Sequence, residues 1–265
     1  MKYLFFLFLV FAAASCKDLF QYSPNEVRLE NSERDLNDKN ILKIQALPAK
    51  DTFRFIVIGD SQRFYDDLQD FVAAANELDG ISFVVLNGDI TDFGLNREYK
   101  AIARIMNELK IPYVGVIGNH DMLANGRLAY NEMWGPENFS FEWSDTRFVF
   151  LNTNSWERKK DETIPDLDWL QQALSGDEVH TARQFVFAHS SPLDTEFDAS
   201  KKQGYADILT GAGVKLSLHG HQHSFNRYVP VRGGLEYLVV ASMNKRSFGL
   251  VTVTNNQYDI EQKFY

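Results

Sequence analysis

The stretch FRFIVIGD, residues 53–60, is a short apolar run rich in β-forming residues that ends in Gly-Asp. A second run of the same kind, ISFVVLNGD at residues 81–89, ends in the same pair. Between the two runs, apolar residues from Leu68 to Leu78 recur at helical spacing, which predicts an amphipathic helix. A strand, a helix and a strand in this order are typical of a βαβ unit with a parallel sheet.

This alternation continues along the chain. The further predicted elements are a helix at 97–109, a strand at 113–121, a hairpin formed by FSFEW and RFVFLN with its turn at 144–146, a helix at 166–174, strands at 184–190 and 214–223, and three strands in the tail. Five of the apolar strands end in polar side chains that could bind a ligand: Asp60, Asp89, Asn119, His189, and the pair His221 and His223. Ligands of open α/β sheets bind beyond the carboxyl ends of the strands, so we expect one functional site there.

The last of these strand ends, HGHQH at residues 219–223, holds three of the six histidines of the chain. On a strand, alternate positions project to one face, and one face rarely closes a coordination sphere. Other strand ends must therefore supply further ligands. We interpret His219 as a strand histidine with a hydrogen-bond partner.

The strand ends form an ordered series of motifs: Gly59-Asp60-Ser61-Gln62, Gly88-Asp89-Ile90-Thr91-Asp92, Gly118-Asn119-His120-Asp121, His189 and Gly220-His221-Gln222-His223. This series resembles the calcineurin-like metallophosphoesterases, whose pattern is GDxH, GDxxD, GNH[DE], H and GHxH. The resemblance covers residues 53–227, and four of the five blocks match fully. It implies an α/β fold, the four-layer α/β/β/α sandwich with two mixed β-sheets.

The resemblance also implies two divalent metal ions, with Mn, Fe, Zn and Mg as candidates. Such a pair clamps and polarises a phosphoryl group and supplies a hydroxide at neutral pH. The implied ligands are Asp89 as the bridge, Asp60, Gln62 and His223 on one ion, and Asn119, His189 and His221 on the other. The expected function is therefore hydrolysis of a phosphate mono- or diester by attack of a metal-bound hydroxide.

Two further residues have implied catalytic roles. His120 would stand beside the ions and stabilise the transition state or protonate the leaving oxygen. Asp121 would orient the imidazole of His120 through its other ring nitrogen, with Asp92 as additional support.

The sequence departs from the family pattern at Gln62, where histidine is usual. An amide oxygen is a harder and weaker ligand than imidazole, and favours ions such as Mg²⁺ or Mn²⁺. The departure leaves open a second hypothesis, in which the chain is a degenerate family member that binds a phosphorylated ligand without turnover. Retention of His120 and Asp121 favours the enzyme.

The N-terminus, MKYLFFLFLVFAAASC, has the charged, apolar and small-residue regions of a secretory signal. Its apolar run is shorter than the about 20 residues of a spanning helix. Its end resembles the lipobox of bacterial lipoproteins, and Cys16 is the single cysteine of the chain. We therefore predict a signal peptide at 1–15, a lipidated tether at 16–50 with a short ordered piece near 41–47, and the metallophosphoesterase domain at 51–265. The predicted location is the cell envelope, anchored to the membrane by lipid on Cys16; the alternative is a secreted protein.

The formal net charge of −9 argues against a nucleic-acid partner, because nucleic-acid backbones are bound by clustered Lys and Arg. The expected partner is a small phosphorylated substrate. Monoesters, diesters and pyrophosphates are all compatible with the implied ligands.

Overall fold

The computed structural model of the chain describes residues 26–158, 161–175, 181–229, 234–255 and 257–265. The predicted signal peptide, Cys16 and the start of the predicted tether lie outside these residues. The helices are α2 (Leu36–Gln45), α3 (Tyr65–Asn76), α4 (Asn96–Met106), α5 (Gly126–Met133), α6 (Leu167–Ser175) and α7 (Lys202–Gly211), with short 3₁₀ turns at Asn31–Glu33, His120–Met122, Trp156–Arg158 and Met243–Lys245. The strands are β1 (Phe53–Ile58), β2 (Ile81–Asn87), β3 (Tyr113–Val116), β4 (Phe139–Trp143), β5 (Thr146–Leu151), β6 (Arg183–Ala188), β7 (Leu216–His219), β8 (Asn226–Tyr228), β9 (Glu236–Val239), β10 (Ser247–Val253) and β11 (Tyr258–Phe264).

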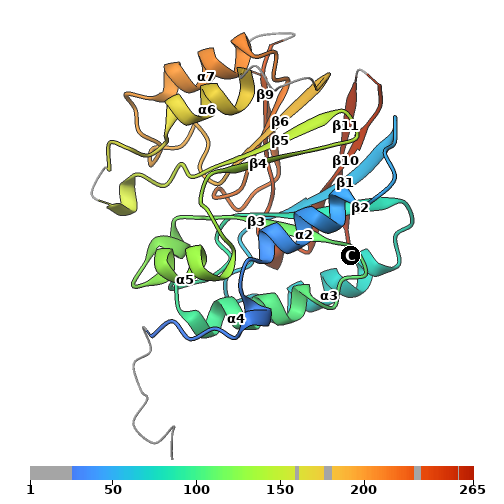
Figure 1. Ribbon diagram of the computed structural model, residues 1–265, viewed down its shortest axis with the longest axis vertical. Coiled ribbons are helices and arrows are strands. Elements are labelled where there is room, and N and C mark those ends of the chain that lie inside the picture. The colour runs from blue at the N-terminus through green and yellow to red at the C-terminus, as the bar shows by residue number, and fades with distance from the viewer. Residues whose placement is uncertain (1–25, 159–160, 176–180, 230–233, 256) are drawn as a thin grey trace, which may run out of the picture.

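The strands form two sheets, with the orders β11-β10-β1-β2-β3 and β4-β5-β6-β7-β9-β8. Strands β1, β2 and β3 are parallel, whereas β10 and β11 are antiparallel additions at one edge. In the second sheet β5, β6, β7 and β9 are parallel, and β4 and β8 close the two edges antiparallel. Helices α3, α4 and α5 lie on one outer side and α6 and α7 on the other, with both sheets between them (Figure 1). The predicted four-layer α/β/β/α sandwich with two mixed sheets is confirmed.

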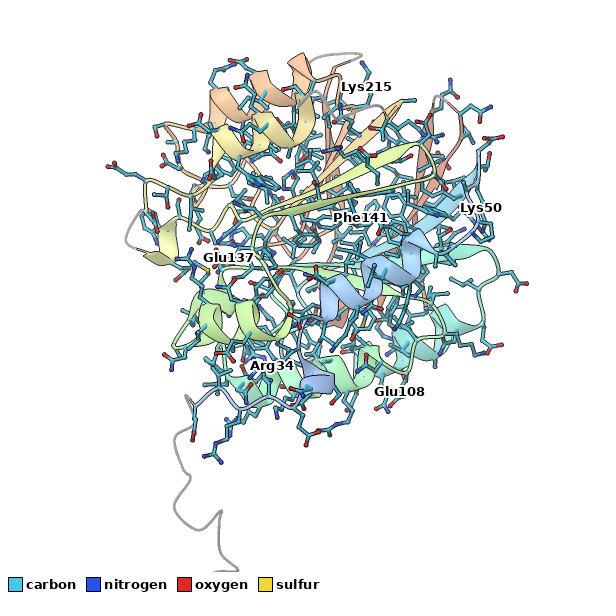
Figure 2. All side chains as sticks on the ribbon, viewed as in Figure 1. Arg34, Lys50, Glu108, Glu137, Phe141 and Lys215 are labelled. Atoms are coloured by element: carbon cyan, nitrogen blue, oxygen red, sulfur yellow. The ribbon has the colours of Figure 1, made fainter. Side chains whose placement is uncertain are left out.

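The layer between the sheets is filled by aromatic side chains. Phe55 and Phe83 stack in parallel with ring centroids 5.2 Å apart, and Phe148 from the other sheet meets the Phe83 ring edge-on at 5.2 Å. Phe141 belongs to the same buried cluster and lies centrally in the molecule, between Lys215 and Glu108 at opposite sides (Figure 2). Because both sheets bury their inner faces against this cluster, their strand ends are held at fixed positions relative to each other.

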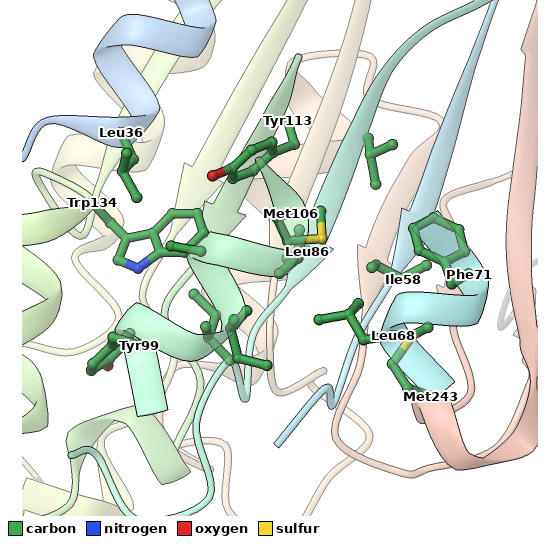
Figure 3. Close-up of a cluster of buried hydrophobic side chains, with 14 of the residues drawn as sticks. Leu36, Ile58, Leu68, Phe71, Leu86, Tyr99, Met106, Tyr113, Trp134 and Met243 are labelled. Carbon is green, nitrogen blue, oxygen red and sulfur yellow. The ribbon is translucent and has the colours of Figure 1, made fainter. Parts of the chain in front are cut away.

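The outer face of the first sheet is covered by a second apolar cluster. Leu68 and Phe71 from α3 and Tyr99 and Met106 from α4 pack there with Trp134, which follows α5 (Figure 3). These residues explain the periodic pattern, since the apolar face of each helix points to the sheet. A third cluster joins α6 and α7 to the outer face of the second sheet.

Helix α2 belongs to this folded body, although it precedes the predicted boundary at residue 51. The side chain of Asn37 is buried and accepts a hydrogen bond from the main-chain N–H of Gly115 at 2.8 Å. Leu36 and Ile44 are buried in the two apolar clusters on either side of the first sheet. The expected ordered piece near 41–47 is therefore a longer helix, and residues 36–45 are part of the packed structure instead of a free tether.

Most other predicted elements agree with the structure, including the hairpin of β4 and β5. Helices α5 and α7 had not been predicted, and the tail holds four strands, β8 to β11, where three were predicted. Helix α7 is short and contains Gly204 and ends at Gly211, which weakens its periodic signal. Within the described ranges, no helix has the length and apolar character needed to cross a membrane.

Candidate metal centre

The polar strand ends of the two sheets come together. Asp60, Asp89 and Asn119 follow β1, β2 and β3, while His189 follows β6 and the pair His221 and His223 follows β7. Asp60, Asp89 and His189 each offer one side-chain oxygen or nitrogen that could bind a metal, and these three atoms lie within 4.8 Å of one another. The site predicted from the sequence is thus a single cluster where the parallel strands of both sheets end.

One half of the cluster is built on Asp60. Its Oδ1 lies 3.1 Å from Nε2 of His223, and both carboxylate oxygens accept hydrogen bonds from the main-chain N–H of His221 at 3.1–3.2 Å. The carboxylate is fully buried, and its ion-pair partner among the described residues is this histidine. Burial of a carboxylate is unfavourable without a charge partner, so a cation would be stabilised here.

The other half is built on Asn119. Its Oδ1 lies 3.0 Å from Nε2 of His189 and 3.0 Å from Nδ1 of His221. The second ring nitrogen of His189 donates to the main-chain oxygen of Asn87 at 2.8 Å. This bond fixes the ring so that Nε2 faces the cluster.

Asp89 joins the two halves. Its Oδ1 lies 3.2 Å from Nε2 of His189, whereas its Oδ2 accepts a hydrogen bond from Nε2 of Gln62 at 3.2 Å. Burial alone would raise the pKa of Asp89, but the charge and hydrogen bond of His189 outweigh it and hold the pKa at about 2. Conversely, Asp89 raises the pKa of His189 to about 10 against the effect of burial. The ionised carboxylate therefore presents one oxygen to each half.

The backbone at this cluster is strained. Ten non-glycine residues of the described chain have a positive φ, and five of them are Asp60 (52°), Gln62 (39°), Asp89 (49°), His221 (71°) and His223 (53°). Each such conformation costs of the order of 1 kcal/mol or more, and strain of this kind gathers at functional sites. The strand ends are thus bent to bring these side chains together.

Two motif glycines are required by close approach. A Cβ on Gly88, which has φ 87°, would lie 2.3 Å from Nδ1 of His189. A Cβ on Gly118 would lie 2.0 Å from the main-chain nitrogen of Asp89. The Gly-Asp and Gly-Asn pairs of the sequence therefore allow the loops of different strands to touch.

His120 lies at the edge of the cluster, with about a third of its side chain exposed. Its Nε2 is 3.9 Å from Oδ2 of Asp89, and its Nδ1 donates to the main-chain oxygen of Asp92 at 2.7 Å. The hydrogen bond at Nδ1 thus fixes the orientation of the ring, with Nε2 directed to the cluster.

The expected role of Asp121 as the partner of His120 is wrong. Its carboxylate instead accepts hydrogen bonds from the N–H groups of Ile90, Thr91 and Gly118 and from the hydroxyl of Thr91, at 2.7–3.0 Å. Burial and the charge of Asp89 raise its pKa to about 6. Asp121 therefore ties the loop after β2 to the loop after β3, and Asp92 supplies the contact to His120 through its main chain.

His219, the first histidine of the HGHQH stretch, and Arg227, which lies shortly after that stretch, have their partners outside the cluster. His219 is fully buried, and its Nε2 hydrogen-bonds with the hydroxyl of Ser217 at 2.9 Å, in agreement with its interpretation as a strand histidine. Arg227 pairs with Glu236 through two contacts of 2.5 and 3.2 Å. Neither side chain is directed to the carboxylates.

Two residues near the cluster had not been found in the sequence. Glu196 lies 3.1 Å from Nε2 of His221, and Arg63 lies 3.4 Å from the carboxylate of Asp92 with two thirds of its side chain exposed. Arg63 directly follows the Gly-Asp-Ser-Gln block, so its proximity had a local signal. Glu196 had none, because only the folded loop brings it near His221.

The arrangement of the donor atoms fits divalent metal ions. Carboxylate oxygens, amide oxygens and imidazole nitrogens are ligands of first-row divalent ions, and those found here converge from five loops. Asp60, Gln62, Asp89 and His189 are buried, whereas Asn119, His221 and His223 are partly exposed. The side chains of both ligand sets expected from the sequence lie in this cluster, with Asp89 in contact with members of each. The fold and these side chains are those expected of the class of metal-dependent phosphoester hydrolases.

Comparison with known proteins identifies the family. The model of the calcineurin-like phosphoesterases matches residues 53–225, and the chain belongs to this family. Its members use divalent metals and hydrolyse phosphoesters of small substrates. A curated relative, the probable glycerophosphodiester phosphodiesterase GpdQ of Arcobacter nitrofigilis, is 39% identical over 56 residues. This match spans 21% of the chain and 20% of the relative, so it covers only a fifth of that protein.

Solved structures show the same fold at low sequence identity. Purple acid phosphatase PPD1 of yellow lupin aligns with 82% of this chain and 52% of its own, at a TM-score of 0.63 and 12% identity. GAP50 of Plasmodium is described as the anchor in the inner membrane complex. The alignment covers 81% of this chain and 85% of GAP50, with a TM-score of 0.63 and 14% sequence identity. The alignment with a putative 5′-nucleotidase of Staphylococcus aureus covers 80% of this chain and 53% of the nucleotidase chain, with a TM-score of 0.54 and 14% sequence identity.

Proposed function

We propose that this chain hydrolyses phosphate mono- or diesters at a centre that holds two divalent ions. Asp60, Gln62 and His223 would hold one ion, and Asn119, His189 and His221 the other. Asp89 would bind both. The observation that carries the proposal is the position of Asp89, whose two carboxylate oxygens face different halves of the cluster at 3.2 Å each.

Bound ions would polarise the phosphoryl group and supply the nucleophile. The remaining chemistry belongs to His120. Its Nδ1–H is held by the Asp92 carbonyl, which leaves Nε2 at the edge of the cluster as the atom that carries a proton to the leaving oxygen. The partial exposure of this ring gives a substrate access to it.

The names of similar proteins suggest which substrates to test. A putative 5′-nucleotidase has a similar fold, and a probable glycerophosphodiester phosphodiesterase matches over 56 residues, so small nucleotides and glycerophosphodiesters are the first compounds to test. The acidic net charge argues against long nucleic acids. We further propose that the chain acts at the cell envelope, tethered by lipid on Cys16, with secretion as the alternative.

A non-catalytic family member remains the second candidate. It is motivated by Gln62, which replaces the usual histidine, and one protein of similar fold is described as an anchor. A family member that only binds has no need for the oriented imidazole of His120, which favours the enzyme.

Assays with p-nitrophenyl phosphate and its bis ester in the presence of Mn²⁺ distinguish the candidates. We expect turnover of at least one compound by the wild-type chain and turnover about 10²–10⁴-fold slower by His120→Ala. Tight metal binding without turnover of either compound, with any of Mn²⁺, Fe²⁺, Zn²⁺ or Mg²⁺, would contradict the proposal that the chain is an enzyme.

A further inference from the structure

Arg63 stands beside the candidate metal centre with an exposed guanidinium. It directly follows Gln62, whose amide donates a hydrogen bond to Oδ2 of Asp89 within the centre. Its Nη1 lies 3.4 Å from Oδ2 of Asp92, and 67% of the side chain is exposed to solvent. A guanidinium is a planar fork of N–H donors, so one contact at this distance leaves most of the fork available to another acceptor.

Other arginines of the chain use the fork within the fold. Arg127 contacts Glu137 with Nε at 2.5 Å and with Nη2 at 3.0 Å. Arg227 contacts Glu236 with the same two nitrogens, at 2.5 and 3.2 Å. Such paired contacts occupy both oxygens of a carboxylate and hold the guanidinium in place. Arg63 meets Asp92 through the longer contact described above, so its guanidinium is the one that remains open to an anion from outside.

Asp92 connects Arg63 with His120. One carboxylate oxygen of Asp92, Oδ2, faces Arg63, and the other, Oδ1, lies 3.9 Å from Nδ1 of His120. The main-chain oxygen of Asp92 accepts a hydrogen bond from the same ring nitrogen at 2.7 Å. A single residue thus separates the guanidinium from the imidazole. Because His120 is the proposed proton donor to the leaving oxygen, Arg63 lies on the side of the centre where the leaving group would be.

We propose that Arg63 binds a second anionic group carried by the leaving group, and that the chain therefore prefers phosphoesters whose leaving group bears a carboxylate or a further phosphate. The planar fork of arginine matches the oxygens of both groups. The carboxylates of Asp89 and Asp92 would repel such an anion, and the charge of Arg63 offsets this repulsion. This inference rests on the proposed function, and it adds the substrate class that this function leaves open.

The test compares 3-phosphoglycerate with glycerol 3-phosphate, using the full chain with Mn²⁺. Both are phosphate monoesters, but the leaving group of the first carries a carboxylate where the second has a neutral hydroxymethyl group. We expect the wild type to have the higher kcat/KM for 3-phosphoglycerate. Arg63→Ala should lower the ratio of the two kcat/KM values about 10–100-fold, the usual worth of hydrogen bonds to a charged group. Arg63→Lys keeps the charge without the fork and should recover part of the ratio.

A matched control separates this effect from the loss of a surface charge. Arg104 is an exposed arginine in the last turn of α4, and Arg104→Ala should keep the wild-type ratio. A wild-type ratio in Arg63→Ala would overturn the inference, even if both kcat/KM values fell, because Arg63 would then act only through its contact with Asp92.

Hydrolysis of p-nitrophenyl phosphate tests the proposed function separately, since its leaving group carries no second anionic group. Turnover of this compound by a wild type that does not favour 3-phosphoglycerate would overturn the role of Arg63 and leave the proposed function intact. If the wild type hydrolysed none of the three esters, the proposed function would fail. Calorimetric affinities for 3-phosphoglycerate and glycerol 3-phosphate would then decide the role of Arg63: a preference for the first that Arg63→Ala loses supports it, and equal or undetectable binding overturns it.

Discussion

Oδ1 of Asp89 lies 3.2 Å from Nε2 of His189, although the two residues follow strands of different sheets. Strand β2 belongs to the five-stranded sheet and β6 to the six-stranded one. The contact therefore closes the site across the layer of aromatic side chains that separates the sheets. Each half of the centre combines side chains that follow strands of both sheets, so a change in the packing between the sheets would alter both halves.

His120→Ala should lower kcat by about 10²–10⁴-fold, the usual contribution of a positioned acid or base. The reason is that Nε2 of His120 stands at the edge of the cluster without being one of its proposed ligands. Steady-state kinetics of the variant measure the fall in kcat, and metal analysis of the same preparation shows whether the variant retains its metal. Loss of metal together with activity would mean that His120 is a ligand.

Gln62→His should tighten metal binding in the Asp60 half, because imidazole is a stronger ligand for first-row ions than an amide oxygen. Gln62→Ala should weaken it, because the donor to Asp89 is also removed. Calorimetric titration with Mn²⁺ measures both variants beside the wild type. Equal affinity in all three proteins would exclude Gln62 from the centre.

Asp121→Asn should destabilise the fold by about 1–3 kcal/mol, since an amide NH₂ would face backbone donors that now reach a carboxylate. Urea denaturation measures this loss, with the exposed Asp168→Asn as the control. Unchanged stability with a large fall in kcat would instead restore Asp121 as the partner of His120.

Asn37→Ala should destabilise the fold by about 1–3 kcal/mol, because the buried N–H of Gly115 would lose its acceptor. The carbonyl of Gly115 keeps its bond from the hydroxyl of Tyr130. Leu42→Ala is the control on the same helix, since Leu42 is 67% exposed. Wild-type stability of Asn37→Ala in urea would mean that α2 is dispensable.

Much of this architecture was predictable from the sequence because its signals are local. The apolar runs before Asp60 and Asp89 each give a strand, and the order of the motifs gives the family and hence the fold. The glycines before Asp89 and Asn119 mark the places where loops meet. The helix α7 was missed because two glycines dilute its apolar period. Only part of α2 was predicted, because its few buried residues lie in a polar stretch.

The partners of the site residues were less predictable, because hydrogen bonds depend on loop geometry. Asp121 follows His120 directly, which suggested that the two interact. The 3₁₀ turn at His120–Met122 directs the carboxylate away from the ring and toward the loop after β2. Glu196 is separated from His221 by α7 and β7, so only the folded chain brings them together.

The central claim is that Asp89 is shared by two metal sites, and metal stoichiometry tests it most directly. Metal-free protein reconstituted with Mn²⁺ and freed of excess ion should contain two ions per chain by elemental analysis. His223→Ala and His221→Ala should each retain one, and Asp89→Ala should bind neither tightly. A single ion in the wild type that both histidine variants lose would contradict the account.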